Sequence, residues 1–325
     1  MAEVLQLVAR PEGAWFIERG LLIQVEGEQY LLKDPRQCSN FVRYLGSSYL
    51  RLLRGPRGNK SLSELVKEAP SMKFWIHKEK REVLRVTSLD FVEIPHQWLL
   101  DLISEELKRR GEPFTVLTRE TKGFNSLLFF DIQLSRTFEI APNDTLGYRI
   151  VGWNKNDAHK ALEIRAGLLR FVCANGMISG AQHNYTWIKH VYPLERVREM
   201  IRASLDSIFN EIESGMHVRI LNEAREVEVY KSPFDIIEAI DPPSLKLREL
   251  LLLRIREEFK KERTLFGLSM AISWVGSNAQ VTINQMRSLQ RLAWFVLIPE
   301  NFESLMERAE KGARSLGGEE EFVEA

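Results

Sequence analysis

The chain has 325 residues, of which 44% are hydrophobic and 28% are charged, with 45 basic and 45 acidic side chains. A chain of this length and apolar content buries a sizeable core, in one large or two modest globular domains. Because the charges cancel, overall charge gives no attraction for nucleic acid, and any such contact must use a local basic patch.

Cysteine usage and the short apolar runs indicate the compartment. Cys38 and Cys173 are the only cysteines, which argues against a disulfide framework and a structural zinc site. The first ten residues carry an early acid and too short an apolar run for a signal peptide. Runs such as 250–253 and 292–298 are far too short to span a bilayer. We therefore expect a cytoplasmic protein without membrane contact.

Residues 1–112 are expected to form an N-terminal α+β region with a basic loop. The alternation over residues 14–34, with Gly20 and Gly27 at the turns, predicts a β-meander. Ser61 and Glu64 have the spacing of a capping box that begins a short helix. Two strands around 73–76 and 83–86 are expected to form a hairpin, and a helix follows from Pro95 to Arg110.

Residues 113–230 are expected to form a central β-meander followed by a long helix. Apolar segments joined by short connections rich in Asn, Asp, Gly and Pro favour antiparallel strands; these segments are 114–118, 126–134, 136–140, 146–153 and 161–173. After Pro193 the apolar residues recur every three or four positions up to Ile212, which predicts a helix lying across the sheet.

Residues 231–316 are predicted to be a helical C-terminal region, and 317–325 a disordered acidic tail. The helices after the long one are expected at 217–229, 233–240, 243–261, 264–275, 283–297 and 300–315, with a capping box at Thr282 and Gln285. The fold class is thus α+β: a central twisted antiparallel β-sheet packed by a long helix in β-β-β-α order, with a mostly helical C-terminal half.

The strand from Leu168 to Cys173 runs into Asn175-Gly176, a pair that accepts positive φ and predicts a reversal of the chain there. Arg170 has strongly apolar neighbours, so we expect a partly buried cation paired with an acid. Arg165 and Arg170 are five residues apart and point to opposite faces of a regular strand.

No familiar catalytic motif is present in the sequence. The phosphate loop, the Gly-x-Gly-x-x-Gly turn, the His-Glu-x-x-His pair and the Gly-x-Ser-x-Gly elbow are all missing. We predict no cofactor and no catalytic residue, although a site assembled from distant residues stays open. Asp157, His159 and His183 are the weak candidates for a metal site, but their spacing fits no standard ligand pattern, and we predict none.

The strongest functional signal is basic. Between Asp34 and Glu64 the chain has six cations and no acid, with Phe41, Tyr44 and Tyr49 among them; the cations are Arg36, Arg43, Arg51, Arg54, Arg57 and Lys60. Such a mixture can neutralise phosphates and stack bases. The alternative is a solvated surface whose aromatic residues pack inward, as we expect for Phe41 and Tyr44 at helical spacing.

A second basic bias runs through the predicted sheet. Arg149, Lys155 and Lys160 are expected to line a groove along which a single strand lies, with Tyr148 and Trp153 as stacking residues.

Two segments resemble the central block of domain-of-unknown-function family 932: Gly147-Tyr-Arg-Ile-Val-Gly-Trp-Asn-Lys-Asn-Asp-Ala-His159 and Leu168-Leu-Arg-Phe-Val-Cys-Ala-Asn-Gly-Met177. The likeness covers about residues 115–270, and members of that family are commonly described as phage- or plasmid-like proteins. Where relatives often have a Ser-His-Asp-Gly turn, this chain has Asn154-Lys-Asn-Asp-Ala-His159. The resemblance implies a mobile-element setting and no activity.

The β-β-β-α order is also that of single-strand annealing recombinases, a likeness at the level of fold alone. The leading hypothesis is therefore a non-catalytic, homo-oligomeric protein of a mobile genetic element or its prokaryotic host that binds or anneals single-stranded nucleic acid, DNA foremost. Its predicted contacts are Arg51, Arg54, Arg57, Lys60, Tyr148, Arg149, Trp153, Lys155 and Lys160. The alternatives are a metal-dependent enzyme acting on nucleic acid and a structural protein that assembles through its helical half.

Overall fold

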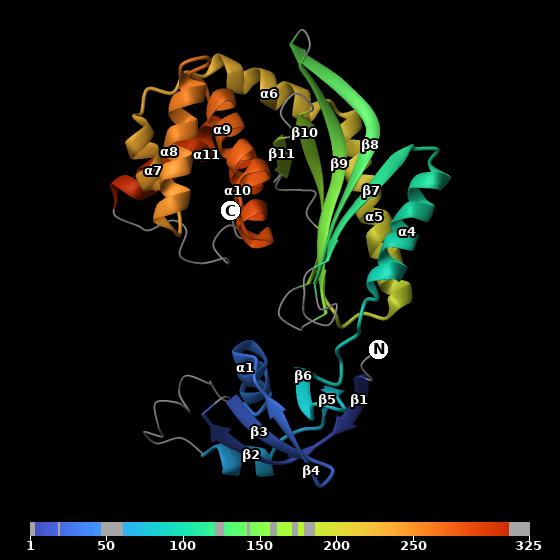
Figure 1. The fold of residues 1–325 in the computed structure, drawn as a ribbon. Coiled ribbons are helices and arrows are strands. Elements are labelled where there is room, and N and C mark those ends of the chain that lie inside the picture. The colour runs from blue at the N-terminus through green and yellow to red at the C-terminus, as the bar shows by residue number, and fades with distance from the viewer. Residues whose placement is uncertain are drawn as a thin grey trace.

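In the part of the chain that the structure describes, two six-stranded β-sheets and the helices packed on them form an α+β fold (Figure 1). The computed structural model describes residues 4–18, 20–46, 61–120, 127–141, 144–156, 161–170, 175–178 and 186–311. The predicted tail at 317–325 lies outside them. Within the described residues, no helix has both the length and the apolar character needed to cross a membrane.

The first sheet, sheet A, forms the N-terminal unit. In spatial order its strands are β1 (Val4–Ala9), β5 (Met72–His77), β6 (Glu82–Thr87), β4 (Glu28–Leu32), β3 (Gly20–Val25) and β2 (Pro11–Ile17). The predicted meander is β2-β3-β4, and the hairpin is β5-β6. Gly20 has φ +139°, and a Cβ atom there would lie 2.2 Å from the Leu32 carbonyl oxygen, so glycine is required.

The described residues of the N-terminal unit also include two helices, α1 (Pro35–Tyr44) and α3 (Leu62–Lys67). Asp34 caps α1, and Ser61 with Glu64 forms the predicted capping box of α3. Phe41 is fully buried against sheet A, as its helical spacing predicts. The core of this unit ends at Val86, before the helix at residue 96.

The second sheet, sheet B, is the predicted central sheet. In spatial order its strands are β11 (Asn175–Ile178), β10 (Leu162–Arg170), β9 (Asp144–Lys155), β8 (Leu127–Ala141) and β7 (Phe114–Glu120), and β12 (Thr186–Ile188) also pairs with β10. All of these pairs are antiparallel. The two segments predicted at 126–134 and 136–140 are one strand, because a register shift after Gln133 lets β8 stay paired with β9.

Sheet B carries two different faces. Even-numbered side chains such as Phe130, Ile150 and Ile164 are buried in a core with α4 (His96–Arg109) and the long helix α5 (Leu194–Glu213). The predicted packing of a long helix on an antiparallel sheet is therefore confirmed. Odd-numbered side chains point to the other face, toward the C-terminal helices. They include the residues that we call the charged face: Asp131, Arg149, Glu163 and Arg165.

A buried carboxylate joins α4 to α5. Glu106 accepts hydrogen bonds from Nε of Arg202 at 2.5 Å and from Nε of Arg109 at 2.9 Å. Burial by itself raises the pKa of Glu106, but the hydrogen bonds and charges of the two arginines outweigh it, so this pKa lies below its ordinary value of 4.5.

Glu106→Gln is expected to lower the free energy of unfolding by about 1 kcal/mol near pH 7, since the two arginines are half exposed and partly screened. Because the folded-state pKa is lowered, the stabilisation is complete above pH 4.5 and is lost as the pH falls through the folded-state value. Urea denaturation of both proteins across a pH series measures this. A difference that stayed constant down to the lowest pH would contradict the ionic origin.

The C-terminal helices pack into the same core as sheet B. They are α6 (Met216–Glu226), α7 (Pro233–Ile240), α8 (Leu245–Phe259), α9 (Leu265–Asn278), α10 (Ile283–Phe295) and α11 (Pro299–Glu310). One continuous cluster of buried residues runs from Ile94 through the sheet to Leu268 and Met306. The expected division near residue 230 therefore falls inside a single core, and α4 belongs to that core as well.

The Asn175-Gly176 pair corrects a prediction about the backbone. Gly176 lies inside β11 opposite Leu169 and does not have the positive φ expected of an Asn-Gly turn. Glycine is needed at this position because two side chains approach it closely. A Cβ atom there would lie 2.4 Å from Nη2 of Arg149 and 2.9 Å from Nε2 of Gln290. Strand β10 ends before this pair, at Arg170, and the connection 171–174 lies outside the described residues.

Helix α9 closes the outer edge of β11. The Gly176 N–H donates to Oγ of Ser277 at 2.9 Å, and Oγ of Ser273 donates to the Gly176 carbonyl oxygen at 2.9 Å. Both serines lie on one face of α9, four residues apart. The side chains of α9 thus satisfy the backbone groups that an edge strand would otherwise leave open.

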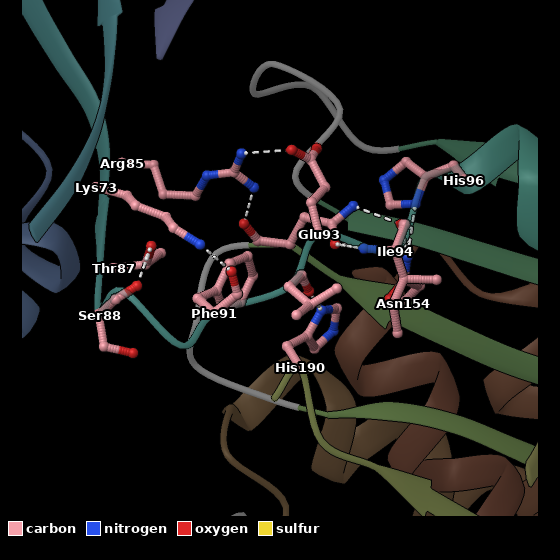
Figure 2. A network of polar contacts seen from close by, with 12 residues as sticks. Lys73, Arg85, Thr87, Ser88, Phe91, Glu93, Ile94, His96, Asn154 and His190 are labelled. Atoms are coloured by element: carbon pink, nitrogen blue, oxygen red, sulfur yellow. Dashed lines mark hydrogen bonds and ion pairs between the residues drawn. The ribbon is translucent and has the colours of Figure 1, made fainter. Parts of the chain in front are cut away.

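A short segment, residues 88–95, joins the N-terminal unit to sheet B (Figure 2). The Ile94 N–H donates to Oδ1 of Asn156 at 3.2 Å, and the Ile94 carbonyl oxygen accepts from the side-chain amide nitrogens of Asn154 at 2.7 Å and Asn156 at 2.9 Å. The Phe91 ring stacks on His190 with centroids 5.0 Å apart. These contacts fix the end of the segment to the core of sheet B.

Two cations of the N-terminal unit contact this segment or the residues beside it. Nζ of Lys73 donates to the Phe91 carbonyl oxygen at 2.7 Å (Figure 2). Arg85 lies 3.8 Å from the ring centroid of Trp75, donates to Glu93 at 3.2 Å and also donates to the Asn156 carbonyl oxygen. Both sheets therefore contact residues 88–95, and specific polar contacts hold this segment between them.

Candidate nucleic-acid interface

Helix α1 presents the first basic residues of the acid-free stretch, which we define as residues 35–63. Its buried side includes Phe41 and Val42, whereas Arg36 and Arg43 are exposed. The Arg43 guanidinium lies 5.8 Å from the Tyr44 ring centroid and donates to Asn40 at 3.4 Å. The amphipathic pattern of α1 therefore turns both arginines toward solvent.

The predicted contacts of the basic loop lie in the next part of this stretch. Arg51, Arg54, Arg57 and Lys60 fall in residues 47–60, outside the described residues. The stretch resumes at Ser61, the cap of α3. Arg36 and Arg43 are therefore the members of this group of cations whose positions the structure gives.

The second predicted patch is buried, which corrects its expected placement. Tyr148 is 6% exposed, Arg149 4%, Trp153 2% and Lys155 7%. Tyr148 packs against Phe138, and burial raises the pKa of its phenol. Side chains packed between a sheet and helices cannot stack on bases in this structure, because both faces of sheet B are covered. Lys160 lies outside the described residues.

Arg149 is the centre of a buried polar network. It donates to Oδ2 of Asp131 at 2.6 Å, to Oε1 of Gln290 at 3.0 Å and to the Met177 carbonyl oxygen at 3.3 Å. Gly167, opposite Arg149 on β10, would bring a Cβ atom 3.0 Å from its Cγ, so two glycines make room for this side chain. The contacts make Arg149 a structural cation that joins β8, β9 and β11 to α10.

Glu163 forms the other half of the charged face. Its carboxylate is 1% exposed and accepts from Arg287 at 3.0 Å and from the indole of Trp187 at 3.3 Å. Arg165, two residues along the same strand face, also donates to it. The Arg287 guanidinium lies 3.5 Å from the Trp153 ring centroid. Charge-assisted hydrogen bonds and a cation–π contact thus hold α10 on the sheet.

The predictions for Arg165 and Arg170 are confirmed. Strands β9 and β10 pair without a register shift, so the two arginines point to opposite faces. Arg170 forms a bidentate pair with Asp144, at 2.6 Å from Nε and 2.5 Å from Nη2. This is the partly buried cation expected from its apolar neighbours.

The weak metal candidates are not placed by the structure. Asp157, His159 and His183 all lie outside the described residues. In the described part of the chain, no group of three His, Cys, Asp or Glu side chains could hold a metal ion. His190 is bonded to the backbone, with its Nδ1 3.0 Å from the Val92 carbonyl oxygen (Figure 2).

Sequence reasoning missed the partners on α10. Gln290 and Arg287 are 141 and 124 residues from the side chains that they contact on the sheet. No local pattern reports a pairing over that separation. A signal in the sequence was the presence of charged side chains at odd positions of β8 to β10, namely Asp131, Arg149, Glu163 and Arg165, which is unusual for a sheet covered by helices.

The fold and its buried charged face define a class: an α+β protein whose antiparallel sheet is packed between a long helix and a helical C-terminal region. Residues 83–218 match the family model described as "Domain of unknown function (DUF932)". This match confirms the resemblance carried by the segments 147–159 and 168–177. It begins before the expected residue 115 and ends before the expected residue 270. No curated protein and no solved structure matches the chain.

Proposed function

We propose that this protein binds single-stranded nucleic acid, DNA foremost, as a non-catalytic homo-oligomer of a mobile genetic element or its host, and that the acid-free stretch 35–63 is the contact. One observation carries the proposal. Six cations and no acid fall in this stretch, and the two that the structure places, Arg36 and Arg43, are both exposed on α1. A formal charge of +6 with no acid inside the stretch is the electrostatic footprint expected of a phosphate-binding segment.

The arginines of sheet B support this location, because they already have acidic partners while the stretch 35–63 contains no acid. Arg149 hydrogen-bonds to the partly buried carboxylate of Asp131, Arg165 to the buried carboxylate of Glu163, and Arg170 pairs with Asp144. Cations that are already neutralised in a core release no counterions when a polyanion binds. We therefore assign the attraction for phosphate to the cations of α1 and the residues that follow it.

Binding is measured by fluorescence anisotropy with a labelled oligothymidylate, the matching oligouridylate and a DNA duplex, over about 50 to 300 mM salt. The double variants Arg36→Glu/Arg43→Glu and Arg54→Glu/Arg57→Glu are each expected to weaken single-strand binding about tenfold or more at the lowest salt. Loss of two phosphate contacts lowers the slope of log K against log salt by about 1.4.

The matched control is Arg198→Glu/Arg219→Glu. This control changes the net charge by the same amount as each of the two test variants, through two exposed arginines, one on α5 and one on α6. Its affinity is expected to stay within about twofold of the unsubstituted protein. The proposal fails if no oligonucleotide binds at low salt, or if the control weakens binding as much as the variants of the stretch do. Light scattering of the free protein tests the homo-oligomer, and a monomer mass at micromolar concentration would remove that part.

A further inference from the structure

Strand β1 lies at one edge of sheet A and carries no charged side chain. Its sequence is Val-Leu-Gln-Leu-Val-Ala, and Val4 is 44% exposed, Leu5 38% and Val8 54%. In the described part of the sheet, β1 pairs with β5 alone, over all six residues and without a register shift (Figure 1). The backbone N–H and C=O groups on its outer side are therefore in position to pair with another strand.

The other edge strands that the structure describes each have a feature that opposes such pairing. In sheet A, β2 begins with Pro11, has a register shift between Pro11 and Gly13, and packs against α3. In sheet B, the serines of α9 close β11, β12 has three residues, and β7 contains Arg119 and Glu120. Natural sheets use such features against edge-to-edge association. Over Val4–Ala9, β1 has no proline, no charged side chain and no bulge.

The side chains of β1 fit a second, antiparallel copy of the same strand. Residues directly opposite each other in an antiparallel pair point to the same face of the sheet, so the two-fold axis between two identical strands passes through a residue position. With the axis at Gln6, Val4 lies opposite Val8 of the second copy, and Leu5 lies opposite Leu7. Apolar side chains then meet on both faces, and the one polar pair, Gln6 with Gln6, lies at the centre.

Charge favours this register and a second copy as the occupant of the edge. With the axis at Gln6, the paired residues bring no charged side chain against another, so association needs no desolvation of a charge and meets no repulsion. Moving the axis by one residue to Leu7 would place Val4 opposite Arg10 of the second copy. Alternation thus selects the register in which the strand is complementary to itself.

Pairing at β1 leaves the proposed nucleic-acid contact outside the paired edge. Helix α1 packs on β6 and β3, and Oε1 of its Gln37 accepts from the Val86 N–H of β6 at 2.9 Å. In sheet A, β5 lies between β1 and β6. Arg36 and Arg43 of α1 are therefore not part of the paired edge, and a dimer offers two such helices to one polyanion, which raises its avidity.

We infer that β1 pairs with β1 of a second copy of the chain, antiparallel and centred on Gln6, and that this edge is the contact of the homo-oligomer. The inference rests on the homo-oligomer in the proposed function and names the surface that forms it.

Gln6→Lys and Gln6→Glu each place like charges opposite each other across the axis, and each is expected to weaken dimerisation about tenfold or more at low salt. An equimolar mixture of the two variants places opposite charges there and should recover the dimer mass. Light scattering and sedimentation equilibrium at micromolar concentration measure the masses. The matched controls, Gln29→Lys and Gln29→Glu, make the same changes at an exposed glutamine of β4, an inner strand of sheet A, and should leave the mass unchanged.

The outcomes separate this inference from the proposed function. If the unsubstituted protein is an oligomer and Gln6→Lys keeps its mass, β1 is not the contact and the homo-oligomer stands. If both Gln6 variants are monomers and their mixture stays monomeric, the copies do not meet at Gln6 and the inference is wrong.

If the unsubstituted protein is a monomer, the pairing of β1 and the homo-oligomer are both wrong, and rapid hydrogen exchange along β1 would then leave this edge to a strand of another protein. Binding of oligothymidylate is decided independently by the anisotropy measurement. Circular dichroism of each variant verifies that it is folded.

Discussion

Replacing Arg149 with methionine is expected to lower the free energy of unfolding by about 3–4 kcal/mol. The substitution leaves the carboxylate of Asp131 without its 2.6 Å partner and removes two further hydrogen bonds to Gln290 and Met177. A side chain that is 4% exposed has no water to replace these contacts. Urea denaturation followed by far-ultraviolet circular dichroism measures the change.

A double-mutant cycle with Asp131→Asn isolates the ion pair. We expect the double variant to be more stable than the sum of the two single effects predicts, by about 1–3 kcal/mol, because each single substitution leaves one charge, buried or partly buried, without its partner. The folded Arg149→Met protein should keep its affinity for oligothymidylate. Normal stability with impaired binding would reverse the assignment and place Arg149 at the nucleic-acid contact.

Glu163→Gln is expected to lower the free energy of unfolding by about 3 kcal/mol. The carboxylate accepts from Arg165, Arg287 and Trp187, and it is 1% exposed. A glutamine amide has one acceptor oxygen and turns a donor group toward the arginines, so two buried cations lose their neutralising charge. Helix α10 should become more accessible to hydrogen exchange than α5.

The matched control is the same substitution at an exposed ion pair. Glu199 pairs with Arg196 at 2.7 Å, and both side chains are more than 60% exposed. Glu199→Gln should change the free energy of unfolding by less than about 0.5 kcal/mol. If the two substitutions had equal effects, the charged face would contribute no more than a surface pair, contrary to its burial.

Local chemistry predicted most of the secondary structure. Ser61 with Glu64, and Thr282 with Gln285, form the capping boxes that their spacing indicated. Gly20 and Gly27 have positive φ at the two turns of the meander. Such signals involve residues within a few positions of each other. They do not depend on tertiary contacts, so the structure keeps them.

The errors came from residues whose role depends on distant neighbours. Gly176 was predicted as a turn glycine, but it is required because Arg149 and Gln290 approach its Cα. Tyr148 and Trp153 were predicted as stacking residues, since an aromatic residue beside a basic one looks the same in sequence whether it is buried or exposed.

The amino-acid sequence by itself determined the α+β class, the antiparallel order of the central strands, the long helix after Pro193 and the acid-free stretch, because periodicity, capping and charge are local properties. Only the tertiary structure decided which cations are neutralised. Alternation shows which residues of a strand share a face with Arg149 or with Arg165, but it does not say what covers that face. Helix α10, more than 100 residues away, covers it and supplies Arg287 and Gln290. That long-range packing buries Arg149 and Trp153, two of the predicted nucleic-acid contacts, and leaves Arg36 and Arg43 of α1 as exposed candidates.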